Sequence, residues 1–91
     1  MSHTSRDKQK LLNRISRIQG QLHAVEKAID EERECSLVLQ TIAACRGAIN
    51  GLMTEMLEGH IRFLLYSEHQ PPKKKAESTE ELIDFVRAYM K

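Results

Sequence analysis

Apolar residues recur at alternating steps of three and four positions along two long stretches of the chain. In the first stretch, about 4–30, they are Leu11, Ile15, Ile18, Leu22, Val25 and Ile29. In the second, about 34–65, they are Cys35, Val38, Ile42, Cys45, Ile49, Leu52 and Met56. This is the spacing of side chains that pack along one side of an α-helix. The pattern therefore predicts two long helices.

Polar residues mark the ends of these two helices. Thr4 or Ser5 is expected to be the N-cap of the first helix, because a short hydroxyl side chain accepts a hydrogen bond from the first turn. Residues 30–33 contain no apolar side chain and indicate a turn into the second helix. Two long helices joined by so short a turn are expected to form an antiparallel hairpin.

A shorter third helix is expected near the end of the chain. Residues 67–77 contain two adjacent prolines and three lysines, which predict an extended basic linker. Ser78 and Glu81 then have the spacing of a capping box. The apolar residues that follow predict an amphipathic helix at about 78–90; they are Leu82, Phe85, Val86 and Tyr89. The predicted fold is all-α, a single domain over 1–91.

Size and composition bear on assembly and location. A chain of 91 residues with 4% aromatic residues and no tryptophan buries little apolar surface alone, which favours oligomerisation. It contains no run of about 18 apolar residues, the length that a membrane-spanning helix needs. Residues 1–10 are too polar for a signal peptide. We therefore expect a soluble, cytoplasmic protein with no membrane partner.

The two cysteines, Cys35 and Cys45, belong to the same predicted helix. Ten positions separate them, about 15 Å along a helix, which is too far for a disulfide bond. Cys45 lies within the apolar pattern and is expected in the core. Cys35 and His60 lie near opposite ends of the helix, roughly 37 Å apart, so one ion cannot bind both in one chain. An antiparallel second copy would bring Cys35 of one chain near His60 of the other, and sites between subunits are the working hypothesis.

Basic residues gather in the first helix although the formal net charge of the chain is only +1. Lys10, Arg14 and Arg17 recur at four and three positions and therefore share one face. This face is either a solvated helix surface or a strip that contacts nucleic-acid phosphates. The chain carries no helix-turn-helix, zinc-finger or RNA-recognition signature, which disfavours base reading by a dedicated recognition helix.

Two other functional classes are alternatives to a nucleic-acid-binding protein. An enzyme with Cys35 as nucleophile is disfavoured, because no suitably spaced base and orienting acid accompany that cysteine. A metal buffer or a helical interaction module that binds no DNA is the second alternative. A gel-shift assay with DNA from upstream of the chain's own gene would separate a DNA-binding protein from such a module.

Several segments resemble the CsoR/RcnR/FrmR family of bacterial repressors. They are SHTSRDKQKLLNRISRIQGQ at 2–21, EC at 34–35, LQTIAACRGAINGLM at 39–53 and EGHI at 58–61. The resemblance implies an antiparallel dimer of long hairpins, a four-helix bundle, that commonly assembles into a homotetramer. It also implies repression of operons for metal efflux, formaldehyde detoxification or sulfur handling, with release of operator DNA when an inducer reaches Cys35.

The resemblance further implies a set of inducer ligands. Cys35 and His60 match the pair that the family places across a subunit boundary, and the Ser2 amine and His3 match the N-terminal donors of its nickel/cobalt branch. Leu64 departs from the pattern, since that branch has histidine there. Four donors still suffice for Ni²⁺, Co²⁺ or Zn²⁺.

The formaldehyde branch is the alternative, and it also lacks a ligand at position 64. In that branch the N-terminal amine and Cys35 are joined by a methylene bridge. Its second residue is usually proline, whereas Ser2 offers a primary amine. The N-terminal match favours the metal interpretation. The residues expected at operator DNA are Lys8, Lys10, Arg14, Arg17 and Arg46.

Overall fold

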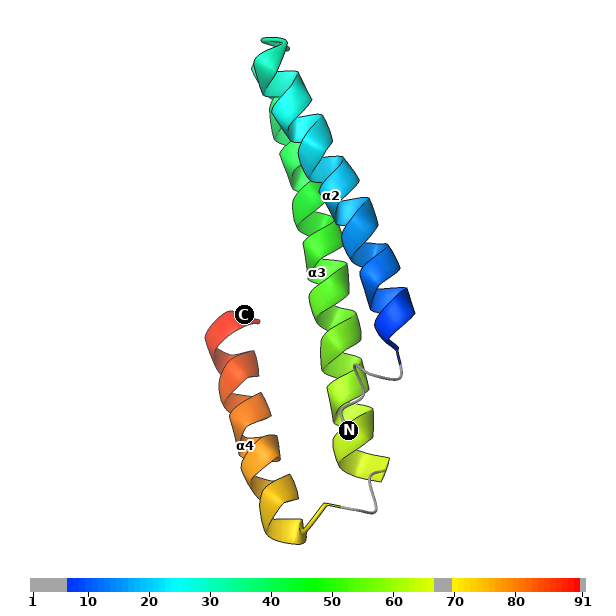
Figure 1. Ribbon diagram of the computed structural model, residues 1–91. Helices are drawn as coiled ribbons and strands as arrows, with labels where there is room; N and C mark the ends of the chain where they lie inside the picture. The colour runs from blue at the N-terminus through cyan, green and yellow to red at the C-terminus, as the bar shows by residue number, and fades with distance from the viewer. Residues whose placement is uncertain (1–6, 67–69, 91) are drawn as a thin grey trace.

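The computed structural model describes residues 7–66 and 70–90. This part of the chain forms the helices α2 (Lys8–Asp30), α3 (Cys35–Tyr66) and α4 (Pro72–Tyr89) and contains no strand. Figure 1 shows α2 and α3 as an antiparallel hairpin, with α4 returning beside the second half of α3. The predicted all-α fold, a long hairpin followed by a shorter helix, is confirmed.

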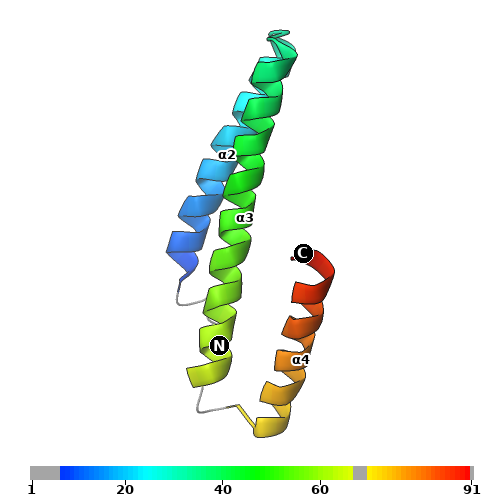
Figure 2. The same ribbon diagram turned by 180° about the vertical axis from the view of Figure 1, so that it is seen from behind.

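The three helices lie in a single layer. α3 lies between α2 and α4 in both views (Figures 1 and 2). The principal extents are 55 × 28 × 13 Å, and the smallest is close to the diameter of one helix, about 10–12 Å. A stable domain normally buries apolar faces between two or more layers. Here both broad faces of the layer lack a covering element among the described residues.

The heptad pattern of α2 is divided between two environments. Leu11 and Val25 are buried and Ile18 is half-buried, all at intervals of seven residues. The intervening row is exposed; its members are Ile15 at 37%, Leu22 at 59% and Ile29 at 58%. One half of the apolar pattern therefore packs inside the hairpin and the other half faces outward.

The apolar pattern of α3 is divided in the same way. Cys45 is buried, as predicted for a core thiol, and Val38 and Leu52 are half-buried seven residues to either side. Ile42 and Ile49, also seven residues apart, are 43% and 46% exposed. Each long helix thus presents a second row of apolar side chains that the hairpin does not cover.

The turn between α2 and α3 is a Schellman motif. The Arg33 N–H donates to the Ala28 carbonyl at 3.0 Å, and the Glu32 N–H donates to the Ile29 carbonyl at 3.0 Å. Glu32 has φ 54°, the left-handed conformation that this motif requires and that glycine usually supplies. The predicted turn at 30–33 is confirmed, with a glutamate at its strained position.

The beginning of α2 differs from the prediction. α2 begins at Lys8, four positions after the expected start, and Asp7 is its N-cap. Thr4 and Ser5, the predicted N-caps, lie outside the described residues. The Asp7 side chain makes no capping hydrogen bond, while its backbone carbonyl accepts from the Leu11 N–H at 3.0 Å. The first turn of α2 is therefore closed by a backbone hydrogen bond.

The beginning of α4 corrects the prediction more strongly. The helix begins at Pro72, so the lysines at 73–75 are helical and the predicted capping box at Ser78 lies inside the helix. Pro72 supplies a fixed φ at the first helical position, where no N–H partner is needed. The Lys75 N–H donates to the Pro71 carbonyl, and the Thr79 hydroxyl donates to the Lys75 carbonyl.

Within the described residues, no helix combines the length and hydrophobicity needed to cross a membrane.

Candidate inducer site and nucleic-acid interface

Cys35 and His60 lie on the same face of α3 at opposite ends. They are separated by twenty-five positions, which is about seven helical turns, so their side chains project in nearly the same direction. Cys35 is the first residue of α3 and is exposed, and His60 is half-buried. In one chain the two donors do not converge.

The face that carries both donors also carries the outward apolar row of α3. Ile42 and Ile49 follow Cys35 at seven and fourteen positions, which is close to two and four helical turns. No group of three or more His, Cys, Asp or Glu residues in 7–66 and 70–90 is placed to hold a metal ion. Within these residues, Cys35 and His60 are therefore separate donors at the two ends of an apolar surface.

The other residues considered for the inducer site are placed as follows. Ser2 and His3 lie outside the described residues, and so does His69 of the linker predicted at 67–77. Leu64 is 8% exposed and belongs to the hydrophobic core. Position 64 is therefore occupied by a packing residue.

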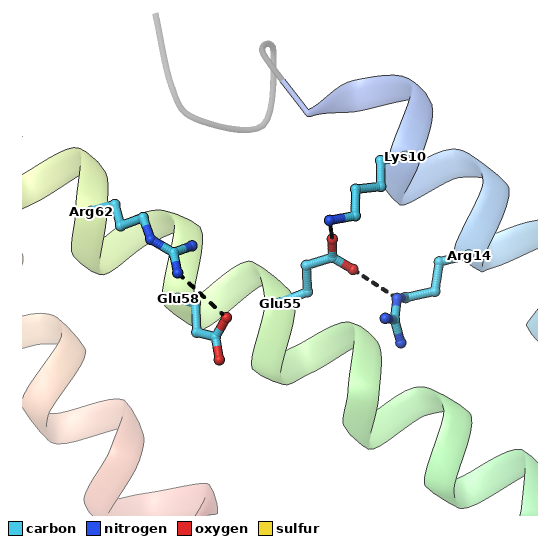
Figure 3. A network of polar contacts seen from close by, with 5 residues as sticks. All are labelled: Lys10, Arg14, Glu55, Glu58 and Arg62. Atoms are coloured by element: carbon cyan, nitrogen blue, oxygen red, sulfur yellow. Dashed lines mark ion pairs between the residues drawn. The ribbon is translucent and has the colours of Figure 1, made fainter.

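The basic strip of α2, defined as Lys10, Arg14 and Arg17, begins near the open end of the hairpin. The Lys10 side chain is 74% exposed and that of Arg14 is 38% exposed, and Arg17 is exposed. Figure 3 shows that Lys10 and Arg14 both point toward Glu55 of α3. Lys10 Nζ lies 2.9 Å from Glu55 Oε1, and Arg14 Nε lies 2.7 Å from Glu55 Oε2.

The Glu55 carboxylate is the centre of this charged cluster. Its side chain is 18% exposed, and hydrogen bonding from Lys10 lowers the pKa of the Glu55 carboxyl below the usual 4.5, against a smaller opposing effect of burial. The Arg14 contact is a close ion pair without hydrogen-bond alignment at Oε2. Glu55 is therefore ionised at neutral pH and bridges α3 to two cations of the strip.

Gly51 makes room for the Arg14 guanidinium. A Cβ built at Gly51 would lie 2.6 Å from Arg14 Nη1, whereas a Cβ at Gly47 would meet no atom of the chain within 4 Å. The absence of a side chain at Gly51 thus accommodates an arginine side chain from α2.

Glu55 is the residue that sequence reasoning missed. A usable signal existed, because Glu55 is the first acidic residue after Glu34 and lies in a largely apolar stretch of the helix. Periodicity alone does not reveal that its carboxylate meets two basic residues of another helix. That pairing is a product of how the hairpin closes.

Lys8 and Arg46 lie apart from the basic strip within one chain. Lys8 precedes Lys10 by two positions and so projects from a different face of α2. Arg46 lines a pocket of about 400 Å³ together with Asn50, Met53 and Tyr89, on the side of α3 that faces α4. Their predicted role at DNA stays a prediction for the assembled protein.

The all-α fold thus carries a basic strip on α2 and has a sulfur donor and a nitrogen donor at opposite ends of α3. Residues 7–88 match the family model described as "Metal-sensitive transcriptional repressor". The transcriptional repressor RcnR of Citrobacter koseri is 53% identical over 83 residues, covering 91% of this chain and 90% of that protein. RcnR of Escherichia coli strain K12 is 48% identical over 92 residues, covering all of both chains.

A solved structure agrees with these sequence matches. A variant of the formaldehyde-responsive regulator FrmR from Salmonella enterica serovar Typhimurium superposes with a TM-score of 0.83 at 43% identity, covering 92% of this chain and 94% of that one. The chain therefore belongs to the metal-sensitive transcriptional repressors, the CsoR/RcnR family, and the resemblance found in the sequence is confirmed.

Proposed function

We propose that this repressor binds operator DNA without inducer and releases it when an inducer binds between two subunits. The proposed site combines Cys35 of one chain with His60 of another, and the Ser2 amine and His3 complete it. Fixing the N-terminal arm beside the start of α2 biases the geometry of the basic strip toward weak DNA binding.

The observation that supports this site is the shared face of Cys35 and His60 on α3. The exposed residues Ile42 and Ile49 lie between them on that face. A second copy that packs antiparallel along this apolar row brings each Cys35 toward the other chain's His60. The chain forms a single layer whose apolar rows are uncovered. A second copy in a dimer covers these rows with a second layer, and two dimers form the proposed tetramer.

A transition metal is the first candidate inducer. One thiolate, two imidazoles and one amine form a four-donor set of the kind that Ni²⁺, Co²⁺ and Zn²⁺ accept. The similarity to two RcnR repressors supports the nickel and cobalt ions named for that branch of the family. The metal acts here as the signal and is not a resident cofactor.

Formaldehyde is the second candidate, supported by the similarity to the formaldehyde-responsive regulator. In that case the Ser2 amine and the Cys35 thiol each lose a proton to the departing carbonyl oxygen, which leaves as water. The carbon remains as a methylene bridge between nitrogen and sulfur. This chemistry needs neither His3 nor His60, which distinguishes it from metal binding.

The proposed DNA surface is the basic strip, repeated by the symmetry of the oligomer. Lys and Arg side chains along a helix contact backbone phosphates, so affinity falls steeply as salt rises. Lys8 and Arg46 lie apart from the basic strip within one chain. We propose that they join the DNA surface where a neighbouring subunit brings them beside a strip. A protein with this role acts at the chromosome, so we expect it in the cytoplasm.

A mixing experiment tests the shared site. Cys35→Ala and His60→Ala chains are each prepared and then refolded together, and gel shifts with DNA from upstream of the chain's own gene are recorded with Ni²⁺ or Co²⁺. In the mixed dimer, one of the two sites keeps Cys35 from one chain and His60 from the other. We expect each variant alone to stay on DNA and the mixture to recover release. No recovery would contradict a site that combines Cys35 of one chain with His60 of another.

The same assay separates the two inducers. His3→Ala and His60→Ala should abolish release by metal but leave release by formaldehyde intact, whereas Cys35→Ala should abolish both. Mass spectrometry of the formaldehyde-treated protein should detect one added carbon only where Cys35 is present. A chain that binds no DNA under any of these conditions would contradict the repressor mechanism itself.

A further inference from the structure

An acidic residue lies within the surface proposed to meet DNA. Glu55 contacts Lys10 Nζ at 2.9 Å and Arg14 Nε at 2.7 Å, and these are two of the three cations of the basic strip. A carboxylate and a phosphate present similar oxygen acceptors to these side chains. In the DNA-free protein, Glu55 therefore fills the place that a phosphate would take.

The surroundings of Glu55 leave room for exchange. An open groove of about 610 Å³ lies beside the cluster, and its charged lining residues are Asp7, Lys10, Arg14, Glu55, Glu58 and Arg62. Lys10 is 74% exposed on a flexible stem, so it can turn from Glu55 to a phosphate without movement of the backbone. Arg14 is held more firmly, because it is 38% exposed and its guanidinium lies over Gly51.

We propose that Glu55 is an internal competitor of DNA phosphate that sets the affinity and the salt dependence of the basic strip. This inference rests on the proposed DNA surface. Lys10, Arg14 and Glu55 together carry a charge of +1 while Glu55 is ionised. Removal of the Glu55 charge raises this sum to +2. The strip then neutralises about one more phosphate, and each such contact steepens the salt dependence of binding by about 0.9 in log–log slope.

Glu58 provides a matched control on the same helix. It lines the same groove but pairs with Arg62 of α3 at 3.9 Å, one helical turn away, and not with α2. Glu58→Gln and Glu55→Gln remove the same charge from neighbouring positions. The difference between them isolates the competition for Lys10 and Arg14 from the general gain of positive charge.

The test measures the Kd of the full-length protein without inducer at several salt concentrations. Two duplexes are used, DNA from upstream of the chain's own gene and an unrelated duplex of equal length. At about 50 mM salt we expect Glu55→Gln to bind both about five- to tenfold more tightly than wild type, with a slope steeper by about one, and Glu58→Gln to change the Kd less than twofold. Lys10→Gln should reduce the gain from Glu55→Gln, because one of the two cations released is then absent.

The outcomes separate this inference from the proposed function. Circular dichroism first establishes that both glutamine variants keep the wild-type helix content. The competitor role is overturned if wild type binds DNA and the Kd of Glu55→Gln equals that of Glu58→Gln. It is also overturned if Glu55→Gln binds DNA more weakly than wild type. Either result leaves the proposed repressor function intact. Wild type that binds neither duplex overturns both.

Discussion

The Glu55 carboxylate of α3 and the Arg14 guanidinium of α2 approach within 2.7 Å near the open end of the hairpin. The pair joins the helix that carries Cys35 and His60 to the helix that carries the basic strip. Because Arg14 lies over Gly51, its position depends on both the charge of Glu55 and the absence of a side chain one turn earlier. The proposed DNA surface is therefore built jointly by two helices.

The outward apolar row of α3 should hold the oligomer together. Ile42→Asp introduces a charge at the centre of this row and should dissociate the oligomer, because an unpaired charge is costly to bury in an interface. Gln40→Asp adds the same charge on an exposed position that projects from a different side of α3. Analytical ultracentrifugation should show smaller species for Ile42→Asp alone, and an unchanged assembly would exclude this face from the interface.

The strained turn offers a stability test. Glu32 adopts φ 54°, a conformation that costs a non-glycine residue about 1–2 kcal/mol. Glu32→Gly should raise the free energy of unfolding by about 1 kcal/mol, after the greater flexibility of glycine in the unfolded chain offsets part of the gain. Chemical denaturation at one fixed protein concentration measures the change. A loss of stability would mean that the Glu32 side chain makes a stabilising contact in the oligomer.

The pH dependence of stability should reveal the Glu55 ion pairs. The folded-state pKa of Glu55 is lowered, so the stabilisation that these pairs supply is complete above the unfolded value of 4.5 and is lost as pH falls through the lowered folded value. The difference in unfolding midpoint between wild type and Glu55→Gln should thus be constant from about pH 8 to pH 6 and shrink only in acid. A difference that disappears near neutral pH would show that another group controls it.

The contribution of single cations to DNA binding should follow the helix face. Arg17 shares the face of Lys10 and Arg14, whereas Lys8 projects elsewhere. Arg17→Gln should reduce the log–log salt slope by about one, the loss of one phosphate contact, and Lys8→Gln should reduce it less. Fluorescence anisotropy titrations at several salt concentrations give both slopes. Equal reductions would mean that DNA contacts both faces of α2 in the oligomer.

Helix ends were the least predictable part of the fold. The sequence contains two competing start signals for α4, Pro72 and the capping-box pair Ser78 and Glu81, and the earlier one prevails. A proline at the first helical position is already in helical geometry, and the residues that follow it are compatible with a helix. Two prolines and three lysines were therefore a poor sign of an extended linker.

Apolar periodicity determined the two long helices, their short turn and the separation of Cys35 from His60, because these depend on spacing along one helix. Periodicity gave one apolar row per helix, and only the packed hairpin decided which members face inward and which remain exposed. Likewise the basic strip was visible in the sequence, but its partner Glu55 was not. Glu55 lies 45 and 41 positions after Lys10 and Arg14. Such pairings are set by the closure of the hairpin, which local sequence patterns do not encode.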